Sequence, residues 1–141
     1  MKKILVINDN QDAADMLSAV LELDGHSVTA AYGAHDGLAF VNAIQPHIVF
    51  LHIGMPELTG YQVAKKIRLL PLSRQPCLIA FTAWSDPGSI EKMKQAGFNQ
   101  HMTKASSVDL HRKLTHRGCG PFLGLVYIVK PKLSRYSIGL R

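Results

Sequence analysis

Short apolar runs alternate along the chain with longer stretches in which apolar residues recur every three or four positions. The apolar runs lie at residues 4–7, 27–31, 48–51, 77–81 and 98–102. Continuous runs of this length are typical of strands that are covered on both faces of a parallel sheet. The pattern therefore predicts five parallel strands, each followed by a helix.

Each stretch after an apolar run predicts a helix with one apolar face. The faces are formed by Ala13, Leu17, Val20 and Leu21, by Leu38, Val41 and Ile44, by Val63, Ile67 and Leu70, by Ile90 and Met93, and by Leu110 and Leu114. Gly25, Pro46 and Pro71 follow the first three helices, where glycine and proline commonly end a helix. Asp86 before Pro87 is a start signal for the fourth helix. Five such units predict an α/β fold with a doubly wound, five-stranded parallel sheet.

Length and charge divide the chain into a domain and a tail. The chain has 141 residues, enough for one domain with a full core, and we expect this domain at residues 1–116. Residues 1–114 hold 11 Lys or Arg and all 10 Asp or Glu, whereas residues 115–141 hold 5 Lys or Arg and no acid. Residues 117–141 therefore form a basic tail, which also contains the apolar run FLGLVYIV at 122–129.

The tail alone does not define a function. Its basic residues are Arg117, Lys130, Lys132, Arg135 and Arg141, without an aromatic platform, a helix-turn-helix pattern or zinc-ligand spacing. We therefore expect no nucleic-acid partner, and direct regulation of DNA ranks last among the functions considered. The apolar run could add to the sheet, cover the last helix or pair between subunits, because an open apolar strand promotes association.

The sequence carries no sign of a membrane location. No apolar run approaches the roughly 20 residues needed to cross a bilayer. The first residues, MKKILVINDN, turn polar too soon for a signal peptide. We therefore expect a cytoplasmic protein. Cys77 and Cys119, the two cysteines, are expected to be free thiols rather than a disulfide framework.

The residues at the carboxyl ends of the predicted strands form a candidate site. Asn8 and Asp9 leave the first strand, His52 ends the third, Thr82 closes the fourth, and Lys104 lies just past the fifth. In an open α/β sheet, ligands bind beyond these ends, near the point where the strand order reverses. For the order 2-1-3-4-5 this point lies between strands 1 and 3. Each residue alone is weak evidence, but their coincidence predicts a shared site.

At these residues the chain resembles the receiver domain of two-component response regulators, the CheY-like family. The resemblance covers about residues 2–114 and rests on the segments ILVINDNQDAADML, IVFLHIGMPELTGYQVAKKIR, LIAFTAW and AGFNQHMTKA. It implies a flavodoxin-like three-layer sandwich with strand order 2-1-3-4-5. It also implies a role in phosphorelay signalling, through protein partners rather than as an enzyme.

The resemblance also implies roles for single residues. For the Mg²⁺ site, Asn8 and Asp9 stand at the family's acidic pair, and Gly54 stands at the residue whose carbonyl completes the Mg²⁺ shell. For phosphorylation, His52 stands at the phosphoacceptor aspartate and Lys104 at the lysine that holds the phosphoryl group. Thr82 stands at the switch hydroxyl, and His101 at a switch side chain that is often Tyr or Phe. The face in which partners and dimer mates bind would include Trp84, although packing over its own loop is an equal alternative.

Two substitutions make this receiver pattern atypical, because Asn8 and His52 stand where carboxylates are expected. Mg²⁺ demands hard oxygen ligands, so we expect negligible Mg²⁺ affinity and no cofactor. Without the metal, a phosphodonor's developing charge has only Lys104 and Thr82 to stabilise it. We therefore expect a site that is degenerate for phosphorylation and a domain that acts by phosphate-independent binding to a protein.

Several alternatives use the same imidazole. His52 could itself be the phosphoacceptor, since an imidazole nitrogen is a competent nucleophile. Beside Asp9 it should keep its proton to higher pH, which would make the pair a pH-sensing switch. A soft-metal site of His52 and Asp9 is conceivable, but two ligands are few. The expected partners are a histidine kinase or another signalling protein, with a homodimer as an alternative, and no membrane.

Overall fold

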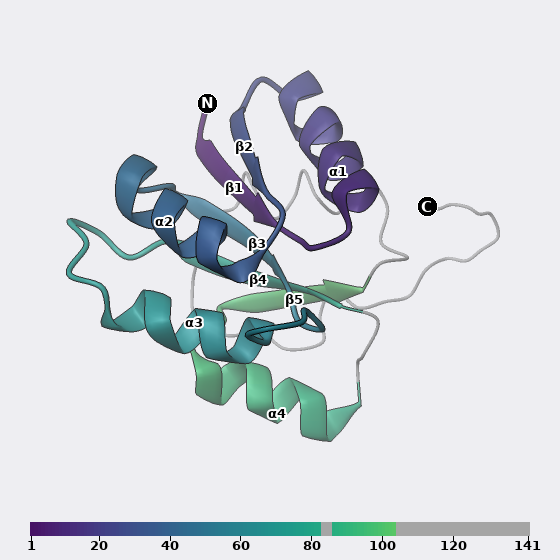
Figure 1. The fold of residues 1–141 in the computed structure, drawn as a ribbon, viewed down its shortest axis with the longest axis vertical. Helices are drawn as coiled ribbons and strands as arrows, with labels where there is room; N and C mark the ends of the chain where they lie inside the picture. The colour runs from purple at the N-terminus through teal and green to yellow at the C-terminus, as the bar shows by residue number, and fades with distance from the viewer. Residues whose placement is uncertain (83–85, 104–141) are drawn as a thin grey trace, which may run out of the picture.

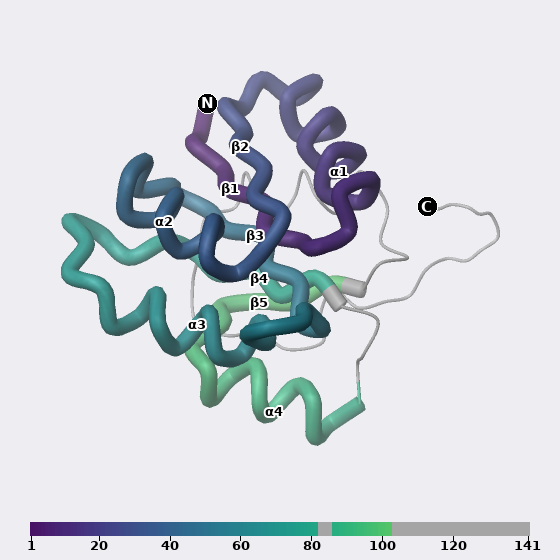
Figure 2. The backbone as a smooth tube through the Cα atoms, in the orientation of Figure 1, coloured from purple at the N-terminus to yellow at the C-terminus, as the bar shows by residue number. Residues whose placement is uncertain are grey.

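The computed structural model describes residues 1–82 and 86–103, and in these residues strands and helices alternate (Figure 1). The elements are β1 (Lys3–Ile7), α1 (Gln11–Leu23), β2 (Ser27–Ala31), α2 (Ala34–Ile44), β3 (Ile48–His52), α3 (Gly60–Leu69), β4 (Cys77–Thr82), α4 (Pro87–Ala96) and β5 (Gln100–Thr103). The five strands form one parallel sheet in the order β2-β1-β3-β4-β5. The backbone trace makes the repeated crossing from strand to helix to strand easy to follow (Figure 2). The predicted fold class and strand order are confirmed.

The sheet is apolar on both faces, as the continuous apolar runs predicted. One core cluster joins the sheet to α2, α3 and α4, which contribute Val41, Ile67 and Met93 among others. The second cluster lies on the other face, where α1 contributes Ala14, Leu17 and Leu21. Figure 1 shows α1 apart from the other three helices, on the opposite side of the sheet. Helices on both faces leave only the strand ends open to ligands.

The helix boundaries follow local capping signals. Asp86 caps α4 by accepting the N–H of Ser89, with Pro87 as the first helical residue, as the sequence predicted. Gly25, just past α1, has a φ of 90°, a conformation that glycine adopts without strain. Thr59 caps α3 in a capping box with Gln62, which sequence reasoning had not singled out.

Strand boundaries differ from the prediction by one or two residues. β3 and β4 each extend one residue further, so that His52 and Thr82 belong to the sheet, with His52 paired to Phe81. β5 begins at Gln100, although the apolar run begins at Phe98. Phe98 is buried, but it packs in the turn after α4 rather than in the sheet. Burial and strand pairing are therefore separate properties of an apolar run.

Some predictions fall on other parts of the chain. The fifth helix with Leu110 and Leu114, the domain boundary at 116 and the tail at 117–141 lie outside the described residues and stay predictions. Cys77 is disulfide-bonded, so the expectation of a free thiol there is wrong. Within the described ranges, no helix combines the length and apolar character that a membrane span requires.

Arg68 on α3 binds two other segments, residues 75–76 before β4 and residues 97–99 between α4 and β5. Its guanidinium donates five hydrogen bonds of 2.7 to 3.0 Å, to the carbonyl oxygens of Gly97 and Pro76 and the side-chain oxygens of Gln75 and Asn99. Gly97 ends α4, where a cation also meets the negative end of the helix dipole. Burial lowers the pKa of Arg68, although the group stays charged. The arginine thus fixes the end of α4 and the turn into β5.

Two histidine rings hold the start of β1. The N–H of Lys2 donates to Nδ1 of His26 at 3.2 Å, and the N–H of Lys3 donates to Nδ1 of His47 at 2.9 Å. A nitrogen that accepts a hydrogen bond carries no proton. The pKa of His47 is lowered, first by partial burial and then by the positive charges of Arg74, Lys2 and Lys3.

Acidification is expected to weaken the fold through His47. Because the folded-state pKa of His47 lies below the ordinary value of about 6.5, the neutral ring stabilises the fold at pH values above about 6.5. This stabilisation is lost as the pH falls toward the folded-state pKa. Urea unfolding at pH 7.5 and pH 5.5 measures the loss. His47→Asn is the control, because its side-chain oxygen can accept the same N–H and does not titrate. An equal loss in both proteins would contradict the assignment to His47.

Candidate functional site

The carboxyl ends of β1 and β3 bring Asn8, Asp9 and His52 to one edge of the sheet. Asn8 is buried, and its backbone N–H donates to the carbonyl of Ala31 at 3.0 Å. Its side-chain oxygen accepts the backbone N–H of Asn10 at 3.0 Å. The amide of Asn8 is therefore engaged in the turn that leads into α1, where Asn10 is the N-cap.

His52 is oriented by the neighbouring strand. Its Nδ1 lies 3.1 Å from the carbonyl oxygen of Phe81 on β4. A carbonyl oxygen only accepts, so Nδ1 carries the proton of this hydrogen bond. The side chain is 13% exposed, and Nε2 lies 4.0 Å from Oδ1 of Asp9, whose side chain is partly exposed. The ring thus bridges β3 and β4 and presents Nε2 to a carboxylate.

This orientation limits the chemistry of the imidazole. When His52 is neutral, Nε2 has the available lone pair, because Nδ1 donates its proton to Phe81. A 4.0 Å gap is too long for a hydrogen bond, yet the two groups are close enough for their charges to interact. In the part of the chain that the structure describes, no three His, Cys, Asp or Glu side chains are arranged to hold a metal ion.

Of the other predicted site residues, the structure describes Thr82 and His101. Thr82 ends β4 and pairs with Thr103 of β5, so it belongs to the same edge of the sheet. His101 lies inside β5 and is fully buried, and burial lowers its pKa. The His101 side chain therefore lies in the interior in its neutral form. The backbone of His101 pairs with Ala80 of β4. Lys104 and Trp84 lie outside the described residues.

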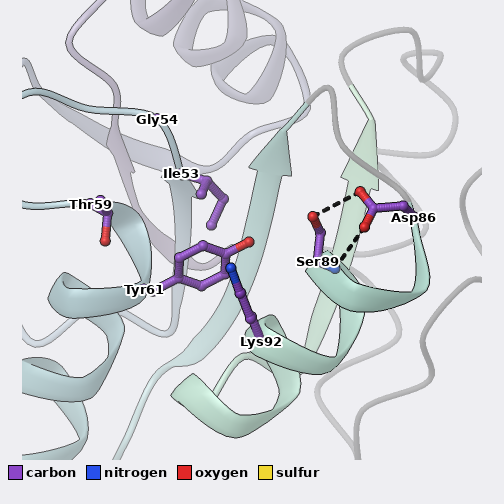
Figure 3. Close-up of a pocket in the computed structure, with 7 residues that line it drawn as sticks. All are labelled: Ile53, Gly54, Thr59, Tyr61, Asp86, Ser89 and Lys92. Carbon is purple, nitrogen blue, oxygen red and sulfur yellow. Dashed lines mark hydrogen bonds between the residues drawn. The ribbon is translucent and has the colours of Figure 1, made fainter.

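Gly54 lines an open hollow of about 480 Å³ that begins just after His52 (Figure 3). The lining residues are Ile53, Gly54, Thr59, Tyr61, Asp86, Ser89 and Lys92. The Tyr61 ring points from α3 toward α4, where Asp86 accepts hydrogen bonds from Ser89 (Figure 3). Burial raises the pKa of Tyr61, and the charge of Asp86 adds to this while Ser89 opposes it. Of these residues, sequence reasoning had found only Gly54 and the Asp86 cap.

Gly60 sets how closely α3 approaches the candidate site. Its N–H donates to the carbonyl oxygen of Ile53 at 2.8 Å. A Cβ at this position would collide with the carbonyl oxygen of His52 and lie 2.8 Å from Cα of Ile53. Because backbone atoms cannot turn away as a side chain can, only glycine fits between α3 and the end of β3. The signal available in the sequence was the Leu-Thr-Gly turn after the strand.

Comparison with known protein families identifies the family of this domain. Residues 4–115 match the family model described as the response regulator receiver domain. The chain belongs to this family. Receiver domains serve two-component signalling and act through protein partners such as kinases, so the expected signalling class is confirmed at this level.

Individual relatives agree with the receiver assignment. The chain is 30% identical over 105 residues to Protein PilH of Pseudomonas aeruginosa, which covers 74% of this chain and 86% of PilH. It is 23% identical over 107 residues to the polar-differentiation response regulator DivK of Brucella anthropi, over 76% of this chain and 87% of DivK. The structure of Vibrio cholerae chemotaxis protein CheY4 is similar with a TM-score of 0.79 and 21% identity, over 84% of this chain and 98% of CheY4. At that identity the structural likeness concerns the fold.

Proposed function

We propose that this receiver domain signals by binding a protein partner without phosphorylation of residue 52. The observation that carries the proposal is the hydrogen bond from Nδ1 of His52 to the carbonyl oxygen of Phe81. This bond joins β3 to the end of β4 next to Thr82. The imidazole of His52 therefore holds the end of β4 against β3, and a protein partner can bind this arrangement without a phosphoryl group.

The ligand set also supports a site without Mg²⁺. Among Asn8, Asp9 and His52, only Asp9 offers a carboxylate. The side-chain oxygen of Asn8 already accepts the N–H of Asn10, and an imidazole nitrogen is a poor ligand for a hard cation. These residues do not fit Mg²⁺, so the domain uses no metal cofactor and catalyses no phosphotransfer of its own.

The geometry weighs against His52 as a phosphoacceptor. The reaction would have to use Nε2, because Nδ1 carries the proton that Phe81 accepts. Nε2 faces Asp9 at 4.0 Å, and a carboxylate repels an incoming phosphoryl group. The proposed partner is therefore a protein that binds the surface of the domain. It is a histidine kinase, another signalling protein of the cytoplasm or a second copy of the chain.

Restoring the acidic acceptor tests the proposal. The wild type, incubated with acetyl phosphate and Mg²⁺, is expected to gain no phosphoryl group by intact mass. His52→Asp is expected to gain one, and Asn8→Asp added to it should raise the yield, because the second carboxylate improves the Mg²⁺ site. His35→Asp is the matched control, since His35 is an exposed histidine whose ring lies 3.2 Å from Glu57 rather than beside Asp9. An acid-labile adduct on wild-type His52 would overturn the proposal.

A pH-dependent switch is the second candidate function, and the facing pair of His52 and Asp9 favours it. A proton on Nε2 would place opposite charges 4.0 Å apart, so the carboxylate stabilises the charged ring. The switch predicts that the ring signals of His52 titrate between pH 5 and 8 in NMR spectra, and that Asp9→Asn moves this titration to lower pH. Ring signals that stay constant across that range exclude it.

A further inference from the structure

Helix α1 is apolar on two opposite sides. Ala14, Leu17 and Leu21 form the side that packs on the sheet. Met16 and Leu23, on the outward side, are 70% and 87% exposed. Ala19 lies between them, and positions three and four apart share a helix face, so the three residues form one apolar line. Two large exposed hydrophobic side chains on one line are a patch rather than isolated residues.

Acidic residues border this line. Asp12 stands one turn before Met16 on the same face, and Asp15 and Glu22 follow one flank of the helix. The hydroxyl of Tyr32 donates to Asp15 at 2.6 Å, which fixes that carboxylate beside the patch. Residues 4–64, which include α1, hold seven Asp or Glu and no Lys or Arg, so this segment of the chain is strongly acidic. The outward face of α1 is both apolar and negative.

We propose that this face, formed by Asp12, Met16, Ala19, Glu22 and Leu23, binds the chain's own residues 117–141. That segment has the complementary composition, because it holds five Lys or Arg, no acid and the apolar run at 122–129. Apolar side chains of the run cover Met16 and Leu23. Lys130 and Lys132, directly after the run, meet the carboxylates. Residue 52 has no part in this contact, so it stands apart from the proposed function.

Length and tethering favour the chain's own segment over a separate partner. Eight extended residues span about 26 Å, and the 13 residues of α1 span about 20 Å, so one can lie along the other. A tethered segment acts at an effective concentration in the millimolar range, which a free partner or second copy rarely matches.

Cross-linking of the full-length protein with a zero-length carbodiimide tests the contact. The reagent joins a carboxylate to an ammonium only where the two touch, and peptide mass spectrometry maps the pairs. Lys130 and Lys132 are expected to join Asp12 or Glu22 in preference to Asp36, Glu57, Asp86 and Glu91. The double variant Met16→Ser and Leu23→Ser should reduce these cross-links severalfold. Leu69→Ser is the matched control, because Leu69 is 84% exposed on α3.

Three results would overturn the inference. Cross-links from Lys130 and Lys132 could be absent or spread evenly over the carboxylates. They could be unaffected by the loss of Met16 and Leu23, which would leave only charge attraction. In a mixture of ¹⁴N and ¹⁵N protein, they could join two different molecules, which would make a second copy the occupant. The intramolecular contact is supported if both cross-linked peptides carry the same nitrogen isotope and the cross-links decrease when Met16 and Leu23 are replaced.

Discussion

Arg68→Ala is expected to lower the free energy of unfolding by about 3 kcal/mol, because buried acceptors lose a charged donor. The carbonyl oxygens of Gly97 and Pro76 each accept from Arg68 at 2.7 to 2.9 Å, and Asn99 accepts at 2.7 Å. Without the guanidinium the part-buried carbonyl oxygens of Gly97 and Pro76 lose their charged donor, whereas Asn99 Oδ1 still accepts the backbone N–H of Leu78 at 2.9 Å. Urea unfolding of wild type and variant at pH 7.5 measures the difference.

Arg74→Ala is the matched control for this substitution. Arg74 is exposed and donates one hydrogen bond of 3.2 Å, to the carbonyl of Gln45. Its loss should change stability by no more than about 0.5 kcal/mol, as is usual for surface positions. Arg68→Lys should recover only part of the loss, since an ammonium cannot reach acceptors on both sides of a planar fork. Equal losses for Arg68→Ala and Arg74→Ala would show that the network contributes little.

Gly60→Ala has the second largest expected effect, a loss of about 2 kcal/mol or more, because overpacking against fixed backbone forces the chain to move. The added methyl group would press on the carbonyl of His52 and on Ile53. The change should therefore also disturb the ring of His52, and NMR shifts of that ring report it together with the urea midpoint.

Gly33→Ala is the control for Gly60→Ala. Gly33 has an extended φ of −171°, and a Cβ there would meet nothing within 4 Å. Because Gly33 is the N-cap of α2, where alanine is less favourable, Gly33→Ala should cost about 1 kcal/mol or less, and it should leave the His52 signals unchanged. If Gly60→Ala behaves like Gly33→Ala, the approach of α3 to β3 is looser than these distances indicate.

The fold was predictable because its signals are local. Each strand run, helix face and cap such as Asp86-Pro87 involves residues within a few positions of one another. The candidate edge of the sheet was predictable for the same reason, since Asn8, Asp9 and His52 directly follow or end strands. Parallel strands then bring those ends together without further information.

The contacts that define the site's behaviour were not predictable in this way. The partner of His52 is a backbone carbonyl 29 residues away, set by the register of β3 and β4 rather than by the identity of Phe81. Arg68 likewise meets Gly97 and Asn99 at separations of 29 and 31 residues. No periodic pattern marks a lone arginine on a helix as the centre of such a network. The disulfide state of Cys77 was mispredicted for the same lack of a local signal.

The position of β1 between β2 and β3 has a consequence for synthesis of the chain. Of the five described strands, β1 leaves the ribosome first, and it is an interior strand. Its second neighbour, β3, follows about 40 residues later, and the N–H of His47 just before β3 donates to the carbonyl of Lys3. At a synthesis rate of roughly 5 to 20 residues per second, β3 emerges several seconds after β1. During this time one edge of an apolar strand stays open on the nascent chain, and a chaperone that binds extended apolar segments has its best opportunity there.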